Sequence, residues 1–153
     1  MVFTKKEAYI KQILIYINQH KFVDSSSLAN EFTQIFPNEL VSHFFLAKSL
    51  FYLKNYEEAM ISARKAFNMS RQNDVITTGV LLGSILYLQN DLAEGYKLLE
   101  SIEKQVGNAK ELQELMAVFA LALNNPERAA EHMSKLLDLN KNYGDGFILT
   151  LLG

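Results

Sequence analysis

The sequence predicts an all-α fold, an α-solenoid of antiparallel helix pairs. Apolar and small residues recur at spacings of three and four residues, which places each set on one face of a helix. The pattern repeats with a period of about 34 residues, and such a period indicates stacked helical hairpins. Only 2 prolines and 7 glycines interrupt the chain, too few for a many-turned β protein. A plain helical bundle is the alternative, but a bundle has no reason to keep one register through four hairpins.

The period divides the chain, taken as a single domain over residues 1–153, into repeats at 6–39, 40–73, 76–109 and 110–143, with a partial helix at 144–153. The turn between the two helices of each repeat recurs in register, at Lys21-Phe22, Asn55-Tyr56, Asp91-Leu92 and Asn125-Pro126. A small residue follows each turn: Ser25, Ala59, Gly95 and Ala129. Small residues there allow the second helix to cross the first closely.

These turns predict eight helices and the start of a ninth. They lie near 6–19, 23–35, 40–53, 56–69, 75–89, 92–105, 109–123 and 126–139, with the last from about 145. Asn125 before Pro126 is a good N-cap with proline at the first helical position. Asp24 to Ser27 offers N-cap candidates for the second helix, and Gly107 is expected to end the sixth.

The stretch from Leu46 to Ala66 resembles the tetratricopeptide repeat (TPR) family. Leu46 and Ala47 in its first helix, and Ala59, Ala63 and Ala66 in its second, stand at offsets that the family uses. The family's tryptophan is replaced in the four repeats by Tyr9, His43, Gly79 and Gln113. The resemblance implies about four repeats in a right-handed superhelix, with the first helices lining a concave groove.

Composition excludes several classes of protein. A net charge of −2 gives no general attraction to nucleic acid or to an anionic membrane. The absence of cysteine excludes disulfides and thiol chemistry. No apolar run reaches the length of about 18 residues that a membrane span needs, and the first residues read as an amphipathic helix rather than a signal peptide. A cytoplasmic protein is therefore expected.

Catalysis has little support in the sequence. The three histidines, His20, His43 and His132, fall in different repeats without a carboxylate or second histidine at metal-ligand spacing. We expect His20 in a solvated turn and His43 at a packing position. Gly79 and Gly83 lack the rest of a phosphate-loop motif, so Gly83 is better explained by close helix packing. We expect no enzyme, no cofactor and no metal.

Helical geometry assigns one face of each first helix to the predicted groove. The predicted binding residues there are Ile10, Leu14, Ile17, Phe44, Lys48, Phe51, Val80, Ser84, Tyr87, Val118 and Leu121. The face turns acidic in the fourth repeat, at Glu111 and Glu114. An exposed apolar face normally marks a partner site, although neighbouring helices of a tightly curled superhelix would bury the same residues. Lys48 alone cannot form the basic clamp with which some TPR co-chaperones hold carboxylates.

These residues favour a non-enzymatic adaptor that binds an apolar peptide or amphipathic helix of another protein. Two alternatives stay open: a small cytoplasmic secretion chaperone similar to those that hold type III translocators, and a self-assembling TPR scaffold. A nucleic-acid partner is disfavoured, since the groove has one lysine against several glutamates. The tail favours self-association, because Phe147 to Leu152 is interrupted only by Thr150 and a helix there would be apolar nearly all round.

Overall fold

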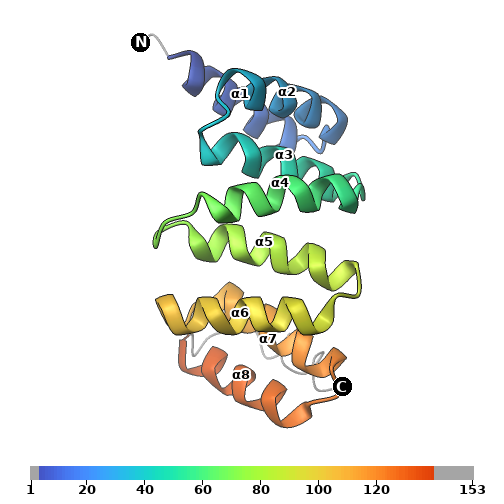
Figure 1. Cartoon of the computed structure of the whole chain (residues 1–153), viewed down its shortest axis with the longest axis vertical. Helices are drawn as coiled ribbons and strands as arrows, with labels where there is room; N and C mark the ends of the chain where they lie inside the picture. Colours follow the sequence, from blue (N-terminus) through green and yellow to red (C-terminus); the bar gives the residue numbers. More distant parts are fainter. Residues whose placement is uncertain (1–3, 140–153) are drawn as a thin grey trace. The chain divides into compact units, whose positions relative to one another are not determined.

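The fold is described from a computed structural model, over residues 4–139. These residues form α-helices and contain no β-strand. The helices are α1 (Lys5–Asn18), α2 (Phe22–Ile35), α3 (Leu40–Tyr52), α4 (Tyr56–Asn68), α5 (Val75–Leu88), α6 (Leu92–Val106), α7 (Lys110–Ala122) and α8 (Pro126–Leu139) (Figure 1). Each of these predicted helices is confirmed, with both ends within one residue of the prediction. The ninth helix, predicted from about residue 145, lies outside the described residues.

The chain separates into two compact units, Met1–Ser70 and Arg71–Gly153. In the first unit α1 packs on α2, α2 on α3 and α3 on α4. In the second unit α5 packs on α6, α6 on α7 and α7 on α8, and α5 also contacts α7. Each unit therefore consists of two helical hairpins, as the repeat pattern predicts.

The turn inside each hairpin is a Schellman motif built on a residue other than glycine. His20, Lys54, Asn90 and Asn124 have φ values of 58°, 63°, 63° and 58°. In the first of these turns the N–H of Lys21 donates to the carbonyl of Tyr16 at 2.8 Å, and that of His20 donates to Ile17 at 3.0 Å. The other three turns repeat both bonds. This left-handed residue ends the first helix and reverses the chain in the same register each time.

The expected cap of the second helix is wrong. Helix α2 begins at Phe22 with Lys21 as N-cap, and no side chain caps it. Asp24 to Ser27 lie inside the helix, because the turn that ends α1 leads directly into helical hydrogen bonding, with the N–H of Ser25 donating to Lys21 at 2.9 Å. The other two boundary predictions are confirmed. The N–H of Arg128 donates to Oδ1 of Asn125 at 3.1 Å, and Gly107 is the C-cap of α6 with φ of 82°.

The small residues that follow the turns lie where the second helix of a hairpin packs against its neighbours. All four are buried, and Ser25, Ala59 and Ala129 have no exposed surface. A Cβ atom on Gly95 would overlap Cζ and Cε1 of Phe119, whose ring is fully buried and belongs to α7 of the next hairpin. The same atom would lie 3.4 Å, an ordinary contact, from Cβ of Leu86 in α5, the first helix of its own hairpin. The tightest packing at Gly95 is therefore with the next hairpin.

Gly83 is also a packing glycine, as predicted. A Cβ atom there would lie 3.1 Å from Cδ2 of Leu115 and 3.2 Å from Cδ2 of Leu99, tighter than ordinary contact. The glycine lets α5 approach these two leucines, one from α6 and one from α7.

The core of the first unit forms around four side chains from three helices. Ile13, Ala29, Phe32 and Phe45 are buried together, and the ring of Tyr9 stacks on that of Phe32 with centroids 5.2 Å apart. Residues of α1 and α3, among them Ile10, Ile17 and Phe44, pack against this cluster. The core thus fixes which faces of α1 and α3 remain on the surface.

We expect Gly95→Ala to destabilise the chain by about 1–3 kcal/mol, because the added methyl overpacks a closed site. The helix-propensity gain of about 1 kcal/mol is too small to offset displacement of the buried Phe119 ring. Urea titration measures the difference. Lys65→Gln, at an exposed position of α4, is the control and should stay within about 0.5 kcal/mol. Equal effects of the two changes would refute the close contact between Gly95 and Phe119.

Candidate functional site

The predicted groove residues all lie at the surface of the chain. None of them is buried, and Leu14 is the most open, with 41% of its surface exposed. The others are partly exposed. The two units present these residues separately, on α1 and α3 in the first and on α5 and α7 in the second.

In the first unit, the predicted residues Ile17 and Lys48 line one hollow of 450 Å³. The remaining lining residues are Asn18, His20, Phe22 and Tyr52. The rings of Phe22 and Tyr52 stack with centroids 4.6 Å apart and form an aromatic wall. We call this the first-unit hollow.

Other predicted residues of the first unit lie outside this hollow. Phe44 packs on the core, and Nζ of Lys48 lies 5.9 Å from its ring centroid, a cation–π contact. The ring of Phe51 contacts Tyr52 and Tyr56, with centroids 5.5 and 6.0 Å away. Ile10 and Leu14 complete the predicted set on α1 without lining the hollow.

In the second unit, a hollow of 280 Å³ forms between α5 and α7. Its lining residues are Val80, Ser84, Glu111, Glu114, Leu115 and Val118. We call this the second-unit hollow. The structure thus brings together three predicted binding residues, Val80, Ser84 and Val118, with the two glutamates expected at the acidic edge. Tyr87 and Leu121 are partly exposed but lie outside it.

Three aromatic or aliphatic lining residues, Phe22, Tyr52 and Leu115, were not predicted as binding residues. Phe22 stands just after a turn and Tyr52 at a helix end. Both lie outside the repeat positions that were assigned to the groove face of the first helices. Leu115 is one position past Glu114, and a slightly wider face on α7 would have included it. Aromatic residues on both sides of a hairpin turn are the signal that could have found the first two.

The described part of the chain contains neither a candidate metal site nor a candidate membrane-spanning helix. Within residues 4–139, no three His, Asp or Glu side chains gather where they could hold a metal ion. In the same range no helix has the length and apolar character to cross a membrane.

Neither a protein-family model nor a curated protein matches this sequence. Solved structures do match the fold. TTC0263, a thermophilic TPR protein of Thermus thermophilus, superposes with a TM-score of 0.81 at 11% identity, over 97% of this chain and 80% of that one. MamA from Desulfovibrio magneticus RS-1 gives 0.79 at 13% identity, over 92% and 78%. The first TPR of Spaghetti (RPAP3), bound to an HSP90 peptide, gives 0.70 at 18% identity, over 78% and 94%.

The chain has the TPR fold. The predicted all-α architecture of about four TPR hairpins is confirmed by these likenesses. Identities this low carry the fold alone, so the chemistry of the sites must come from the chain's own residues.

The fourth TPR hairpin contains a buried polar network where the family has tryptophan. Gln113 occupies that position, is fully buried, and joins α7 to α6 and α8. Its Nε2 donates to Oε2 of Glu103 at 2.5 Å and to Oδ1 of Asn108 at 3.2 Å. Its Oε1 lies 2.7 Å from Nδ1 of His132. This amide orientation requires His132 to donate from Nδ1.

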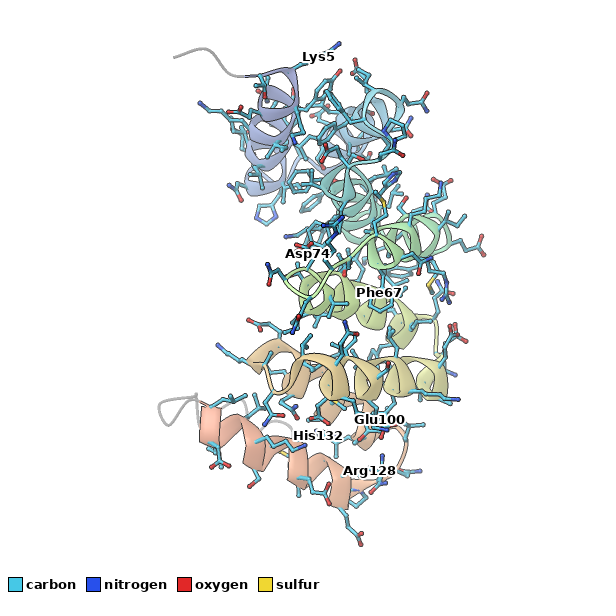
Figure 2. All side chains as sticks on the ribbon, turned by 60° about the vertical axis from the view of Figure 1, so that its left-hand side comes forward. Lys5, Phe67, Asp74, Glu100, Arg128 and His132 are labelled. Atoms are coloured by element: carbon cyan, nitrogen blue, oxygen red, sulfur yellow. The ribbon has the colours of Figure 1, made fainter. Side chains whose placement is uncertain are left out.

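Burial lowers the pKa of His132, which favours the neutral ring, in which Nε2 accepts. The hydroxyl of Tyr96 lies 2.7 Å from that nitrogen and donates to it. Beside the network, Nη1 of Arg128 pairs with Glu100 at 2.9 Å, and its guanidinium lies 5.6 Å from the centroid of the Tyr96 ring (Figure 2). Both ring nitrogens of His132 are thus used within the protein, so the histidine has a structural role.

Burial and hydrogen bonding shift two pKa values in this network. Burial lowers the pKa of His132, and the nearby Glu103 carboxylate only partly opposes the effect. For Glu103, burial alone would raise the pKa, but hydrogen bonds from Gln113 and Lys135 outweigh it and lower the pKa. Nζ of Lys135 lies 3.0 Å from Oε2 of Glu103.

We expect the free energy of unfolding to fall as the pH drops from about 7.5 to about 5.5. Histidine in the unfolded chain binds a proton near its ordinary pKa of 6.5, whereas His132 in the folded chain resists protonation. The unfolded state then holds more protons, so stability rises with pH across this window. The lowered pKa of Glu103 adds stability above pH 4.5 that is lost below it. Urea titrations at several pH values measure both effects.

His132→Gln should flatten the upper part of this pH dependence, although it also removes hydrogen bonds and lowers stability at every pH. His20→Gln is the matched control for the loss of an imidazole, because His20 is exposed in a turn. If the His132→Gln variant kept the slope of the unaltered chain, His132 would not be its source.

Proposed function

We propose that this chain is a non-enzymatic protein-interaction module, a cytoplasmic adaptor that binds an apolar peptide or amphipathic helix of another protein. The observation that carries the proposal is that each unit has a hollow lined in part by aliphatic or aromatic side chains. Ile17 with Phe22 and Tyr52 forms one such lining, and Val80 with Val118 belongs to the other.

Exposed apolar residues scattered singly would not support a binding site. Val23 and Leu137, for example, are 66% and 44% exposed on second helices. The residues that line the two hollows differ because they surround concave surface, where a partner's side chain loses water on several sides. Aromatic and aliphatic anchors in such settings dominate binding, and truncating one commonly costs over about 1 kcal/mol.

The RPAP3 domain supports the general mode, since it binds an HSP90 peptide with a similar fold. The chemistry proposed for this chain differs. Lys48 is the single basic residue among the predicted binding residues, and a lone lysine is poorly suited to hold several carboxylates. Apolar contact is therefore the more favourable source of affinity here.

Catalysis is not proposed, because no histidine stands in a reactive arrangement. Both ring nitrogens of His132 bond to protein groups, and Nε2 of His43 donates to the carbonyl of Pro37 at 2.7 Å. His20 lines the first-unit hollow, but none of the described residues lining it is a carboxylate that could orient the ring.

Two narrower functions would place a segment of a different protein chain on the same faces of the first helices. A secretion chaperone would hold an apolar segment of a type III translocator, and a self-assembling scaffold would hold a segment of a second copy. The adaptor is preferred because it needs only the faces described above, without a further assumption about which chain supplies the segment.

We expect Tyr52→Ala and Val118→Ala to reduce capture of the native partner from the host, because each removes a side chain that lines one of the two hollows. Affinity pull-downs with quantitative mass spectrometry would measure the change. Leu137→Ala is the matched control, since it removes an exposed apolar side chain from the second helix α8. A partner lost with Leu137→Ala but kept by both other variants would place the site on the second helices.

The scaffold alternative has its own test, in the apolar stretch 147–152, which lies outside the described residues. If that stretch drives self-association, light scattering should give a mass that rises with concentration, and deletion of Gly146–Gly153 should abolish the rise. A strict monomer at all concentrations, unaltered by the deletion, would exclude this contact.

A further inference from the structure

We propose that the first-unit hollow binds a proline-rich segment of another protein in the polyproline II conformation. This inference rests on the proposed function, because it names the class of peptide that is bound. The residues concerned come from α1, α2, α3 and the turn between the first two helices, all within one unit. Two properties of the lining support the inference, an exposed aromatic stack and a set of hydrogen-bond donors without a carboxylate.

The aromatic wall of the hollow is open to a ligand. The planes of the Phe22 and Tyr52 rings make an angle of 21°, and 45% of the surface of Tyr52 is exposed. The ring of His20 extends the wall, since it meets that of Phe22 edge-on with centroids 5.5 Å apart. Packing between α2 and α3 accounts for the stack but does not require so much of Tyr52 to stay exposed. A flat apolar ring of a ligand can pack against this surface.

The second unit shows that the fold does not need this aromatic and polar lining. Counted along the 34-residue repeats, the equivalent positions there are aliphatic: Leu92 for Phe22, Ala122 for Tyr52, Leu88 for Asn18 and Val118 for Lys48. Both units nevertheless form two hairpins with the same succession of packed helices. The lining of the first-unit hollow is therefore better explained by a ligand than by the packing of the hairpins.

The polar side chains of the hollow are hydrogen-bond donors. Asn18, His20, Lys48 and Tyr52 can each donate, and none of the described residues that line the hollow is a carboxylate. Within residues 4–139, the polar side-chain atoms of these four residues have no hydrogen-bond or ion-pair partner, and Lys48 makes only its cation–π contact with Phe44. A ligand that brings acceptors without donors would match them.

A proline-rich segment brings acceptors of this kind. Proline has a backbone carbonyl but no N–H, and a polyproline II helix has no internal hydrogen bonds, so its carbonyls stay available. In an α-helix the carbonyls are bonded within the helix. An extended peptide of other residues also brings N–H groups, for which this lining has no carboxylate. Polyproline II segments are known to dock into grooves lined by aromatic residues, which agrees with the stack of Phe22 and Tyr52.

The dimensions of the hollow also fit such a segment. Its 450 Å³ lies within the range of about 300–1,000 Å³ that is typical of ligand sites. A polyproline II helix has three residues per turn, so residues i and i+3 lie on the same side and can enter the hollow together. The helix is already formed before binding, and little conformational entropy is lost.

Composition separates this partner from a second copy of the chain. The chain contains 2 prolines, Pro37 and Pro126, so no stretch of it is proline-rich. An acidic segment is the competing partner, because a carboxylate would pair with Lys48. A carboxylate alone, however, would leave the stack of Phe22 and Tyr52 without a contact. The aromatic wall therefore favours a proline-rich segment of another protein.

Fluorescence anisotropy with the full chain and a fluorescein-labelled peptide of about ten L-prolines tests the inference. The same peptide made of D-prolines is the control, because it has the same composition and the opposite helical hand. We expect the D-proline peptide to bind at least about tenfold more weakly. Two further labelled peptides, one an amphipathic helix and one rich in glutamate, represent the competing partners.

Three variants locate the contacts. Tyr52→Ala should weaken binding of the L-proline peptide more than about fivefold, as loss of an aromatic anchor does. Tyr52→Phe removes only the hydroxyl and should weaken binding about two- to tenfold. Asn18→Leu, which introduces the residue of the equivalent second-unit position, should weaken binding similarly, whereas a purely apolar site would bind more tightly. Leu137→Ala should change nothing and is the matched control, since Leu137 is 44% exposed and Tyr52 45%.

The outcomes separate this inference from the proposed function. The inference would be overturned if the L-proline peptide did not bind, bound no better than its D-proline form, or bound Tyr52→Phe and Asn18→Leu as tightly as the unaltered chain. Tighter binding of the helical or glutamate-rich peptide, sensitive to Tyr52→Ala, would also overturn it and leave the adaptor function standing. If Tyr52→Ala changed neither the binding of these peptides nor capture of the native partner, the result would count against both.

Discussion

The close approach of the second helix of each hairpin to the helices packed beside it is the constraint on which the rest of the structure depends. A helix backbone can approach another only where a side chain is small, and the chain provides Ser25, Ala59, Gly95 and Ala129 at those points. Packing compensates for the differences in size. Gly95, the smallest, receives the large Phe119 ring, whereas the hydroxyl of Ser25 is buried against that of Ser49, with the oxygens 2.7 Å apart. Once this packing is fixed, so are the faces that remain for partners.

Helix ends could be predicted to within one residue because the repeat register located every turn. The usual local signal was missing, since His20, Lys54, Asn90 and Asn124 hold the left-handed positions where glycine is commonest. The recurrence of the turn through four hairpins located the helix ends, which no single residue marked.

The wrong N-cap prediction at Asp24 to Ser27 has a different cause. Good capping residues were present, but the turn left no non-helical gap in which they could act.

The candidate sites were predictable where they follow helical geometry. Ser84 of α5 and Val118 of α7 hold equivalent positions of successive repeats, and Val80 lies one turn before Ser84. That these residues line one hollow therefore follows from the repeat. The network of Tyr96, Gln113 and His132 does not. Its members come from three helices and are up to 36 residues apart, and only the folded chain shows that their polar atoms satisfy one another. In the sequence, Gln113 was merely a departure from the family's tryptophan.

Gln113 also affects the second-unit hollow, because α7 carries Gln113 and one wall of that hollow. Gln113 lies between Glu111 and Glu114 in the chain but points into the core, where its amide bonds to Glu103 and His132. Rotation of α7 about its axis would break these buried hydrogen bonds, and leaving such groups unpaired costs more than an exposed contact returns. A tryptophan would fill the space through non-directional contact, whereas the amide fixes the angle of the helix. The polar core of the fourth hairpin thus sets which face of α7 lines the second-unit hollow, and the residue that departs from the family pattern orients that surface.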